Sequence, residues 1–177
     1  PKLFEIMNGV KAMRECGPDL VIGFGGGSPM DAAKIMRLLY AHPDADFRAM
    51  AITFLDIRKR SYRFPSLLED TKTKLRCVST TSGTGSEVTP VAVVTDEKTG
   101  IKYPLADYEL TPQIAGVDAD FVMDMPRGLT AAPGMDVLTH DIESYVSVIA
   151  TEFTQPYSLQ PNKLIFDYLP SRYEQGA

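Results

Sequence analysis

A short apolar run followed at once by consecutive glycines is the feature that most constrains the fold of this chain. Leu20–Phe24 is apolar and bounded by glycine, which predicts a short buried β-strand. The loop Gly25–Pro29 follows, and a helix is predicted from Pro29 to about Tyr40. Strand, glycine loop and helix in this order form the first part of a βαβ unit, so the sequence predicts an α/β fold.

The glycine run at residues 25–27 allows two interpretations. Glycines let the backbone approach a diphosphate closely, and the N-terminus of the next helix offers free N–H groups and the positive end of the helix dipole. Alternatively the segment is a helix cap, with Ser28 as the N-cap, Pro29 at the first helical position and Asp31 completing a capping box. Capping does not account for three consecutive glycines after a strand, and both interpretations stay open.

The α/β pattern continues up to about residue 125. Residues 42–74 are polar and mixed, and no helix or strand is predicted there. The elements expected around them are a helix at 3–16, a strand at 75–78, a hairpin of strands 91–95 and 101–105, and a strand at 114–117.

The pattern changes at Pro126, where strand signals vanish and helical spacing takes over. A further helix is predicted over residues 155–169. We therefore expect a domain boundary near Met125, with a partial α/β domain in residues 1–125 and a helical domain beginning in residues 126–177. The apolar stripe of the first helix consists of Leu138, Ile142, Tyr145 and Ile149.

A second loop, Thr80–Ser86, directly follows the predicted strand at 75–78. Its hydroxyl groups and glycines are typical of loops that bind polar ligands at the carboxyl end of a parallel sheet. Ser, Thr and Gly are also ordinary turn residues, and for this loop taken alone a plain turn is the simpler interpretation. Two glycine-containing loops that each follow a buried strand strengthen the binding interpretation for both.

Asp136 and His140 are four residues apart in a helical stretch, so both side chains are expected on one helix face. A carboxylate and an imidazole suit Fe(II) or Zn(II). Two ligands do not make a metal site, and the other histidine, His42, falls in a predicted loop. The spacing alone favours a surface Asp–His pair over a metal site.

Composition argues against several classes of function. The chain has 177 residues, is 44% hydrophobic and carries a formal net charge of −5, which argues against electrostatic binding to nucleic acid or to an anionic membrane. No stretch reaches the roughly 20 apolar residues of a membrane span. Cys16 and Cys77 form no CxxC pair, which favours a reducing, cytoplasmic compartment. The basic run Arg58–Arg60 is typical of a solvated or interface surface.

Several segments together, in the right order and spacing, resemble the iron-containing alcohol dehydrogenase family. Two others, Phe54–Arg60 and Lys102–Tyr108, resemble the subgroup that is fused to a CoA-dependent aldehyde dehydrogenase. The resemblance covers nearly the whole chain. The family segments are Gly25–Lys34, Thr80–Glu87, Val117–Asp118 and Gly134–His140.

The resemblance implies a dehydroquinate synthase-like α/β nucleotide-binding domain followed by the start of an all-α metal-binding domain. The cleft between such domains holds the cofactor, here NAD, and the metal. By resemblance, Gly26, Gly27 and Ser28 contact the cofactor pyrophosphate, and Asp31 lies near the nicotinamide end. The residues implied to line the rest of the cofactor are Thr80, Thr81 and Thr84, with Lys102 on the ribose side.

The resemblance also makes Asp136 and His140 the first two of four metal ligands, usually for Fe(II), with Zn(II) as an alternative. The other two are histidines further downstream. The sequence departs from the family pattern at Pro133, at Asp141, where a small apolar residue is expected, and at Pro161, which should interrupt the last helix. These departures affect the packing of the helical part more than the cofactor loops.

The chain starts at Pro1 inside an amphipathic pattern, so we expect it to be an internal piece of a longer protein. The expected activity is NAD-dependent interconversion of acetaldehyde and ethanol by hydride transfer, in a homo-oligomer or filament. Its partners would be a small alcohol and aldehyde. Two alternatives stay open: oxidation of a polyol or another alcohol on the same fold, and a non-catalytic assembly segment, because the chain lacks half of its metal ligands.

Overall fold

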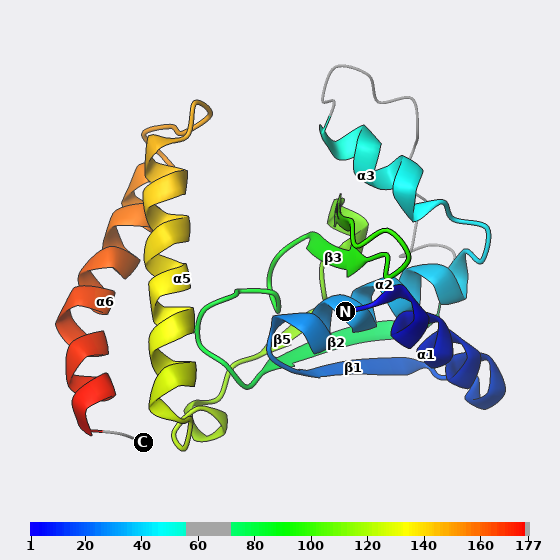
Figure 1. Ribbon diagram of the computed structural model, residues 1–177, viewed down its shortest axis with the longest axis horizontal. Coiled ribbons are helices and arrows are strands. Elements are labelled where there is room, and N and C mark those ends of the chain that lie inside the picture. Colours follow the sequence, from blue (N-terminus) through cyan, green and yellow to red (C-terminus); the bar gives the residue numbers. More distant parts are fainter. Residues whose placement is uncertain (56–71, 176–177) are drawn as a thin grey trace. The chain divides into compact units, whose positions relative to one another are not determined.

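The parallel sheet predicted from the first apolar run is present in the structure. The computed structural model describes residues 1–55 and 72–175 of the chain. Strand β1 (Leu20–Gly25) pairs in parallel with β2 (Lys74–Ser79), which pairs in parallel with β5 (Ile114–Gly116). The strand order is β1-β2-β5, as Figure 1 shows. Parallel neighbours require crossover connections, so the α/β expectation is confirmed.

Helix α2 (Gly27–Ala41) covers one face of this sheet. Its Met30 and Ala33 are buried in one cluster with Cys77 of β2. A Cβ at Gly23 would lie 3.1 Å from the Cβ of Ala33 and 3.1 Å from the Sγ of Cys77. The close approach of α2 to β1 therefore depends on glycine at this position, and it fixes the start of α2 directly beyond the end of β1.

A second core joins α2 to α1 (Leu3–Cys16) and to an antiparallel hairpin of β3 (Val91–Thr95) and β4 (Lys102–Ala106). The predicted helix at 3–16 and the predicted hairpin are both confirmed. Buried side chains from all of these elements interdigitate, and they include Ile6, Val10, Ile35, Leu38, Val94 and Leu105.

Helix α3 (Phe47–Leu55) lies in a region where the sequence pattern predicted no element, so that expectation is wrong there. Its Phe47 and Met50 are buried in the second core, and the Phe47 ring meets Tyr103 of β4 edge to face, with centroids 5.5 Å apart. The helix exists because its apolar side pairs with the hairpin, a partner far away in the sequence. The basic run Arg58–Arg60 lies outside the described residues.

Two short 3-10 helices complete the connections. Asp107 caps η1 (Tyr108–Leu110) by accepting a hydrogen bond from the Glu109 N–H at 3.1 Å. Asp118 caps η2 (Ala119–Phe121) in the same way. A short polar side chain before each turn therefore sets where it begins.

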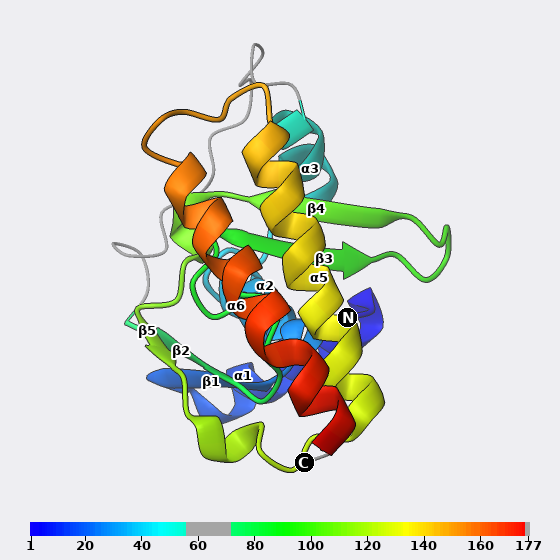
Figure 2. The same cartoon turned by 90° about the vertical axis from the view of Figure 1, so that its left-hand side faces the viewer.

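The helical part of the chain consists of α5 (Arg127–Val146) and α6 (Gln155–Gln175), which lie side by side in Figures 1 and 2. Between the two helices the hydroxyl oxygens of Ser144 and Ser158 are 2.5 Å apart. The stripe expected to run on to Ile149 ends with α5, because Ile149 lies beyond the helix and is exposed.

Prolines do not divide these helices. Pro133 lies inside α5, and α6 continues through both Pro161 and Pro170, so the expected interruption at Pro161 is wrong. Contact with the neighbouring helix offsets the local cost of proline. The packing is close where Gly134 meets α6, since a Cβ on Gly134 would lie 2.7 Å from the Leu169 methyl carbons.

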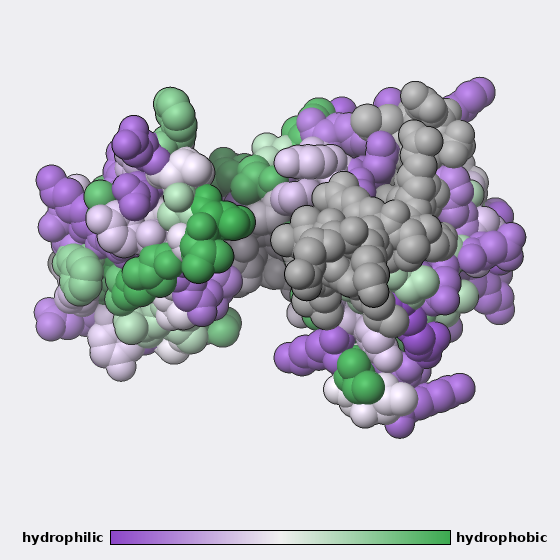
Figure 3. Space-filling model, turned by 90° about the horizontal axis from the view of Figure 1, so that it is seen from above, coloured by the Kyte–Doolittle hydropathy of each residue, from purple (hydrophilic) through white to green (hydrophobic). Residues whose placement is uncertain are grey.

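Apolar side chains also cover much of the helical part from outside. The chain between α5 and α6 is especially rich in them, and Figure 3 shows apolar side chains gathered on this part of the molecule. The exposed residues include Val146, Val148, Ile149 and Phe153.

The chain forms two compact units. The α/β unit comprises Pro1–Ser79 and Gly85–Val117, and the helical unit comprises Thr80–Thr84 and Asp118–Ala177. The domain boundary near Met125 stays a prediction of the sequence. Among the described residues, no helix is long and apolar enough to cross a membrane.

Candidate functional site

The turn between β1 and α2 contains a position that only glycine can occupy. Gly25 has φ +144, and a Cβ there would lie 2.8 Å from the Cγ of Pro29, so this position requires glycine. Helix α2 begins at Gly27, and its N-cap Gly26 makes no side-chain capping bond. The first N–H groups of a helix have no partner within it, and the dipole there is positive. This end of α2 can therefore bind an anion such as a diphosphate.

The alternative interpretation of this loop as a capping box is wrong. Ser28 and Pro29 lie within the first turn of α2, not at the N-cap and the first position. The Asp31 carboxylate turns away from the helix start. Its Oδ1 accepts a hydrogen bond from the Ser86 hydroxyl at 2.5 Å, and its Oδ2 accepts one from the Val93 N–H at 3.0 Å. Asp31 thus binds the chain leading into β3, and its role near the nicotinamide stays a prediction.

The second loop is divided between the two units. Thr80, Thr81 and Thr84 fall in the helical unit, and the segment from Gly85 onward falls in the α/β unit. Thr80 and Thr81 are half-buried and Thr84 is exposed. Gly83 of the same loop lies against Pro133 of α5, and the role of the three threonines toward a cofactor stays a prediction.

Lys102 is the first residue of β4 and pairs with Thr95 of β3. It is exposed, and in the described part of the chain no hydrogen bond or ion pair joins it to Gly26, Gly27 or Ser28. The hairpin connects it indirectly to Asp31, which binds β3 at Val93. Its place on the ribose side of a cofactor stays a prediction.

The structure brings Asp136 and His140 together on one exposed face of α5. The Nε2 of His140 lies 3.6 Å from the Oδ2 of Asp136, and their side chains are 61% and 47% exposed. The expected shared helix face is confirmed. One carboxylate and one imidazole suit Fe(II) or Zn(II) in kind, but they are two donors. Among the described residues no three His, Cys, Asp or Glu side chains converge on one point.

The next residue along α5, Asp141, is an unfavourable carboxylate. Its Oδ2 is buried and has no hydrogen-bond partner among the described residues. Burial raises the pKa of Asp141, and the charge of His140 opposes that rise. A carboxylate at this position of α5 is therefore buried without compensation by a donor among the described residues.

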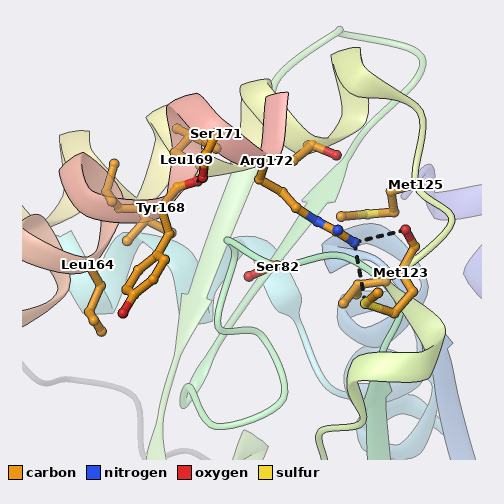
Figure 4. Close-up of a pocket in the computed structure, with 13 residues that line it drawn as sticks. Ser82, Met123, Met125, Leu164, Tyr168, Leu169, Ser171 and Arg172 are labelled. Carbon is orange, nitrogen blue, oxygen red and sulfur yellow. Dashed lines mark hydrogen bonds between the residues drawn. The ribbon is translucent and has the colours of Figure 1, made fainter. Parts of the chain in front are cut away.

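The helical unit also contains an apolar cleft of about 420 Å³ that the sequence pattern did not predict. Figure 4 shows that Arg172 of α6 points toward Met123. Its Nη2 donates to the Met123 carbonyl oxygen at 3.0 Å. The spacing of Thr130, Gly134 and Val137 could have predicted that one face of α5 lines this cleft, because these residues recur at intervals of four and three in a helix. The lining residues include Ser82, Thr130, Gly134, Val137, Leu164, Tyr168 and Leu169.

The parallel sheet with its glycine turn, followed by a helical unit, defines a nucleotide-binding α/β protein with an attached all-α part. The family model for iron-containing alcohol dehydrogenase matches residues 1–119. The model for the C-terminal part of the Fe-containing alcohol dehydrogenase family matches residues 130–177. The chain therefore belongs to the iron-containing alcohol dehydrogenase family.

Individual relatives agree with this assignment. The chain is 54% identical, over all 177 residues, to a bifunctional aldehyde-alcohol dehydrogenase of Escherichia coli (strain K12) and spans 20% of that protein. An iron-containing alcohol dehydrogenase from Thermococcus thioreducens superposes with a TM-score of 0.86 at 32% identity, covering 98% of this chain and 44% of the other. A sulfoacetaldehyde reductase from Bifidobacterium kashiwanohense, solved with NAD+, superposes with a TM-score of 0.83 at 29% identity. The match covers 98% of this chain and 43% of the reductase. The chain thus spans about one fifth of the curated relative.

Proposed function

We propose that the protein containing this chain is an NAD-dependent, metal-dependent alcohol dehydrogenase that interconverts acetaldehyde and ethanol by hydride transfer. The bifunctional relative from Escherichia coli supports the aldehyde and alcohol pair, and the NAD+ complex of the Bifidobacterium relative supports the cofactor. The observation that carries the proposal is the start of α2 directly beyond β1, with glycine at its N-cap position 26.

The backbone at the start of α2 would hold the pyrophosphate of the cofactor. The N–H groups at Gly26, Gly27 and Ser28 would bind the pyrophosphate, because they belong to the N-terminal turn of α2. The hydroxyl groups of Thr80, Thr81 and Thr84 and the exposed Lys102 would bind the sugar and amide parts. These contacts would fix the position of the cofactor, and the transferred hydride is the cofactor's own chemistry.

The helical unit would supply two metal ligands, Asp136 and His140. They fit Fe(II), or Zn(II), in donor type and in sharing one helix face, with the remaining ligands coming from elsewhere in the protein. When bound, such a metal acts as a Lewis acid on the alcohol or carbonyl oxygen. The carboxylate of Asp136 and the ring of His140 lie side by side on α5. Replacing either residue by alanine is therefore expected to weaken metal binding.

The substitution Gly26→Val tests the cofactor site in the intact protein. Gly26 has φ −77 and ψ −164, an extended conformation that valine adopts readily, so the variant is expected to fold. A branched side chain there would keep the pyrophosphate away from the helix, and NADH affinity should fall at least about tenfold, which is the effect of losing one or two charge-assisted hydrogen bonds. NADH fluorescence titration measures it.

The control is Gly128→Val, at a position where a Cβ meets nothing within 4 Å. It should bind NADH as the unaltered protein does. Unchanged affinity in a folded Gly26→Val variant would exclude this turn as the phosphate site.

A second experiment tests the substrate class. It compares the turnover of acetaldehyde with NADH to the turnover of polyols with NAD+, and a preference for polyols would contradict the acetaldehyde proposal.

We further propose a cytoplasmic homo-oligomer. Cys16 and Cys77 are both free thiols, which supports a reducing compartment. The exposed apolar side chains of the helical unit support association with further protein surface. Size-exclusion chromatography with light scattering on the intact protein measures the assembly.

A further inference from the structure

Lys34 is a fully buried ammonium on α2 to which the proposed function gives no role. Its Nζ donates to the carbonyl oxygens of Thr89 at 2.9 Å and of Val91 at 2.7 Å, and to the Thr89 hydroxyl at 3.3 Å. Three acceptors match the three N–H donors of an ammonium group. Lys34 therefore ties α2 to the chain that enters β3.

Asp31, one turn earlier on α2, binds the same segment that leads into β3. It accepts hydrogen bonds from the Ser86 hydroxyl and from the Val93 N–H. The segment from Ser86 to Val93 is thus held at its ends by an anion and in its middle by a cation. Both charges belong to the helix whose N-terminus is the proposed phosphate site.

The charges around Lys34 are predominantly negative. Burial lowers the pKa of Lys34, and the charges of Asp31 and Glu87 oppose that change. Burial raises the pKa of the Cys77 thiol to about 11, so this group is neutral at pH 7. The Oε2 of Glu87 is buried and has no hydrogen-bond partner in the described part of the chain. Asp31 and Glu87 are therefore the acidic side chains whose charges act on the Lys34 ammonium.

We propose that Lys34 is a positioning residue for the cofactor: it holds α2 on the Ser86–Val93 segment and balances the carboxylates of Asp31 and Glu87, so that an anionic diphosphate can bind at the helix N-terminus. The proposal rests on the proposed function, because the ligand is the cofactor's pyrophosphate. From Gly27 to Lys34 the helix rises about 10 Å at 1.5 Å per residue. At that distance an uncompensated charge inside a protein still acts on a bound anion.

The substitution Lys34→Met in the intact protein removes the cation and keeps an unbranched apolar side chain that is one heavy atom shorter. NADH affinity should fall about tenfold, the effect expected of an uncompensated charge about 10 Å away, and the KM for NADH should rise more than kcat falls. The matched control is Arg37→Met, since Arg37 is also a buried cation of α2 but its Nε donates to the Thr73 carbonyl oxygen at 3.0 Å. Both variants should lose stability, and only Lys34→Met should lose affinity.

A second substitution separates charge from packing. Glu87→Gln, added to Lys34→Met, removes one excess negative charge at almost constant volume and should restore most of the NADH affinity. A purely structural role of Lys34 would give no such recovery. If Lys34→Met does not fold, Lys34→Gln, which keeps an N–H donor without the charge, serves in the same comparison.

Equal NADH affinity of Lys34→Met and Arg37→Met, or no recovery in the double variant, would overturn the proposal and leave the dehydrogenase function standing. Absence of NADH binding by the unaltered protein would instead overturn the proposed function. The two failures are therefore distinguishable by titrating the unaltered protein first.

Discussion

Gly83 approaches Pro133 so closely that a Cβ on residue 83 would lie 2.5 Å from the Cβ of Pro133 and 2.7 Å from its carbonyl oxygen. Both residues belong to the helical unit. The contact holds the loop Thr80–Thr84 against α5, one turn before Asp136. A loop predicted to line the cofactor is therefore packed on the helix that carries the predicted metal pair.

The substitution Gly83→Ala should destabilise this packing. The added methyl group meets backbone atoms of Pro133, which cannot turn away as a flexible side chain can. Overpacking of this kind costs about 1–3 kcal/mol, and urea unfolding measures it. Gly128→Ala, in the first turn of α5 with nothing within 4 Å of its Cβ, should be neutral or slightly stabilising. Equal stability of the two variants would contradict the close contact.

The ion pair between Arg48 and Asp96 should govern part of the acid stability of the α/β unit. Arg48 Nη2 lies 2.6 Å from Asp96 Oδ2, and the hydrogen bond from Arg48 is the main cause that lowers the pKa of Asp96. A carboxyl with a lowered pKa stabilises the fold above its unfolded pKa, and this stability is lost as the pH falls through the folded value.

Arg48→Met should therefore shift the midpoint of acid unfolding to higher pH, because the pKa of Asp96 rises toward its ordinary value. Circular dichroism during acid titration measures the shift. The control Arg14→Met removes an exposed arginine of α1 and should leave the midpoint in place. An unmoved midpoint in Arg48→Met would show that the pair does not contribute.

The two cysteines should differ sharply in reactivity. Burial raises the pKa of Cys77 to about 11, so at pH 8 its thiol stays protonated, whereas Cys16 is exposed. In the folded protein an aromatic disulfide reagent should therefore label Cys16 quickly and Cys77 only after denaturation. A Cys16→Ser variant should show almost no reaction until urea is added. Rapid labelling of that variant would mean that the β2 core opens readily.

The 177-residue chain by itself should show no dehydrogenase activity. A Lewis-acid metal needs firm coordination with one open position, and the described residues bring together two donors, Asp136 and His140. To test this, the chain is loaded with Fe(II) anaerobically and the oxidation of NADH is followed in the presence of acetaldehyde. Turnover that His140→Ala abolishes would show that the chain builds a working site alone.

Local patterns predicted most of the elements. Leu20–Phe24, the glycine turn and the following helix are neighbours in the sequence, so their geometry depends on few residues, and α1 and the hairpin were predicted for the same reason. Helix α3 was not predicted, because Phe47 and Met50 gain their stability from a hairpin about fifty residues away. The continuity of α6 through Pro161 likewise depends on a neighbouring helix and not on local propensity.

The sequence by itself determined the glycine turn between strand and helix and the shared helix face of Asp136 and His140, because four-residue spacing in a helix sets that face directly. Only the tertiary structure decided the partners of Asp31 and Lys34, which lie 55 residues or more along the chain. A buried charge forms hydrogen bonds with the donors or acceptors that the folded chain places around it. The folded chain also leaves so little space at position 83 that glycine is required there. Such contacts depend on the whole fold and cannot be derived from spacing in the sequence.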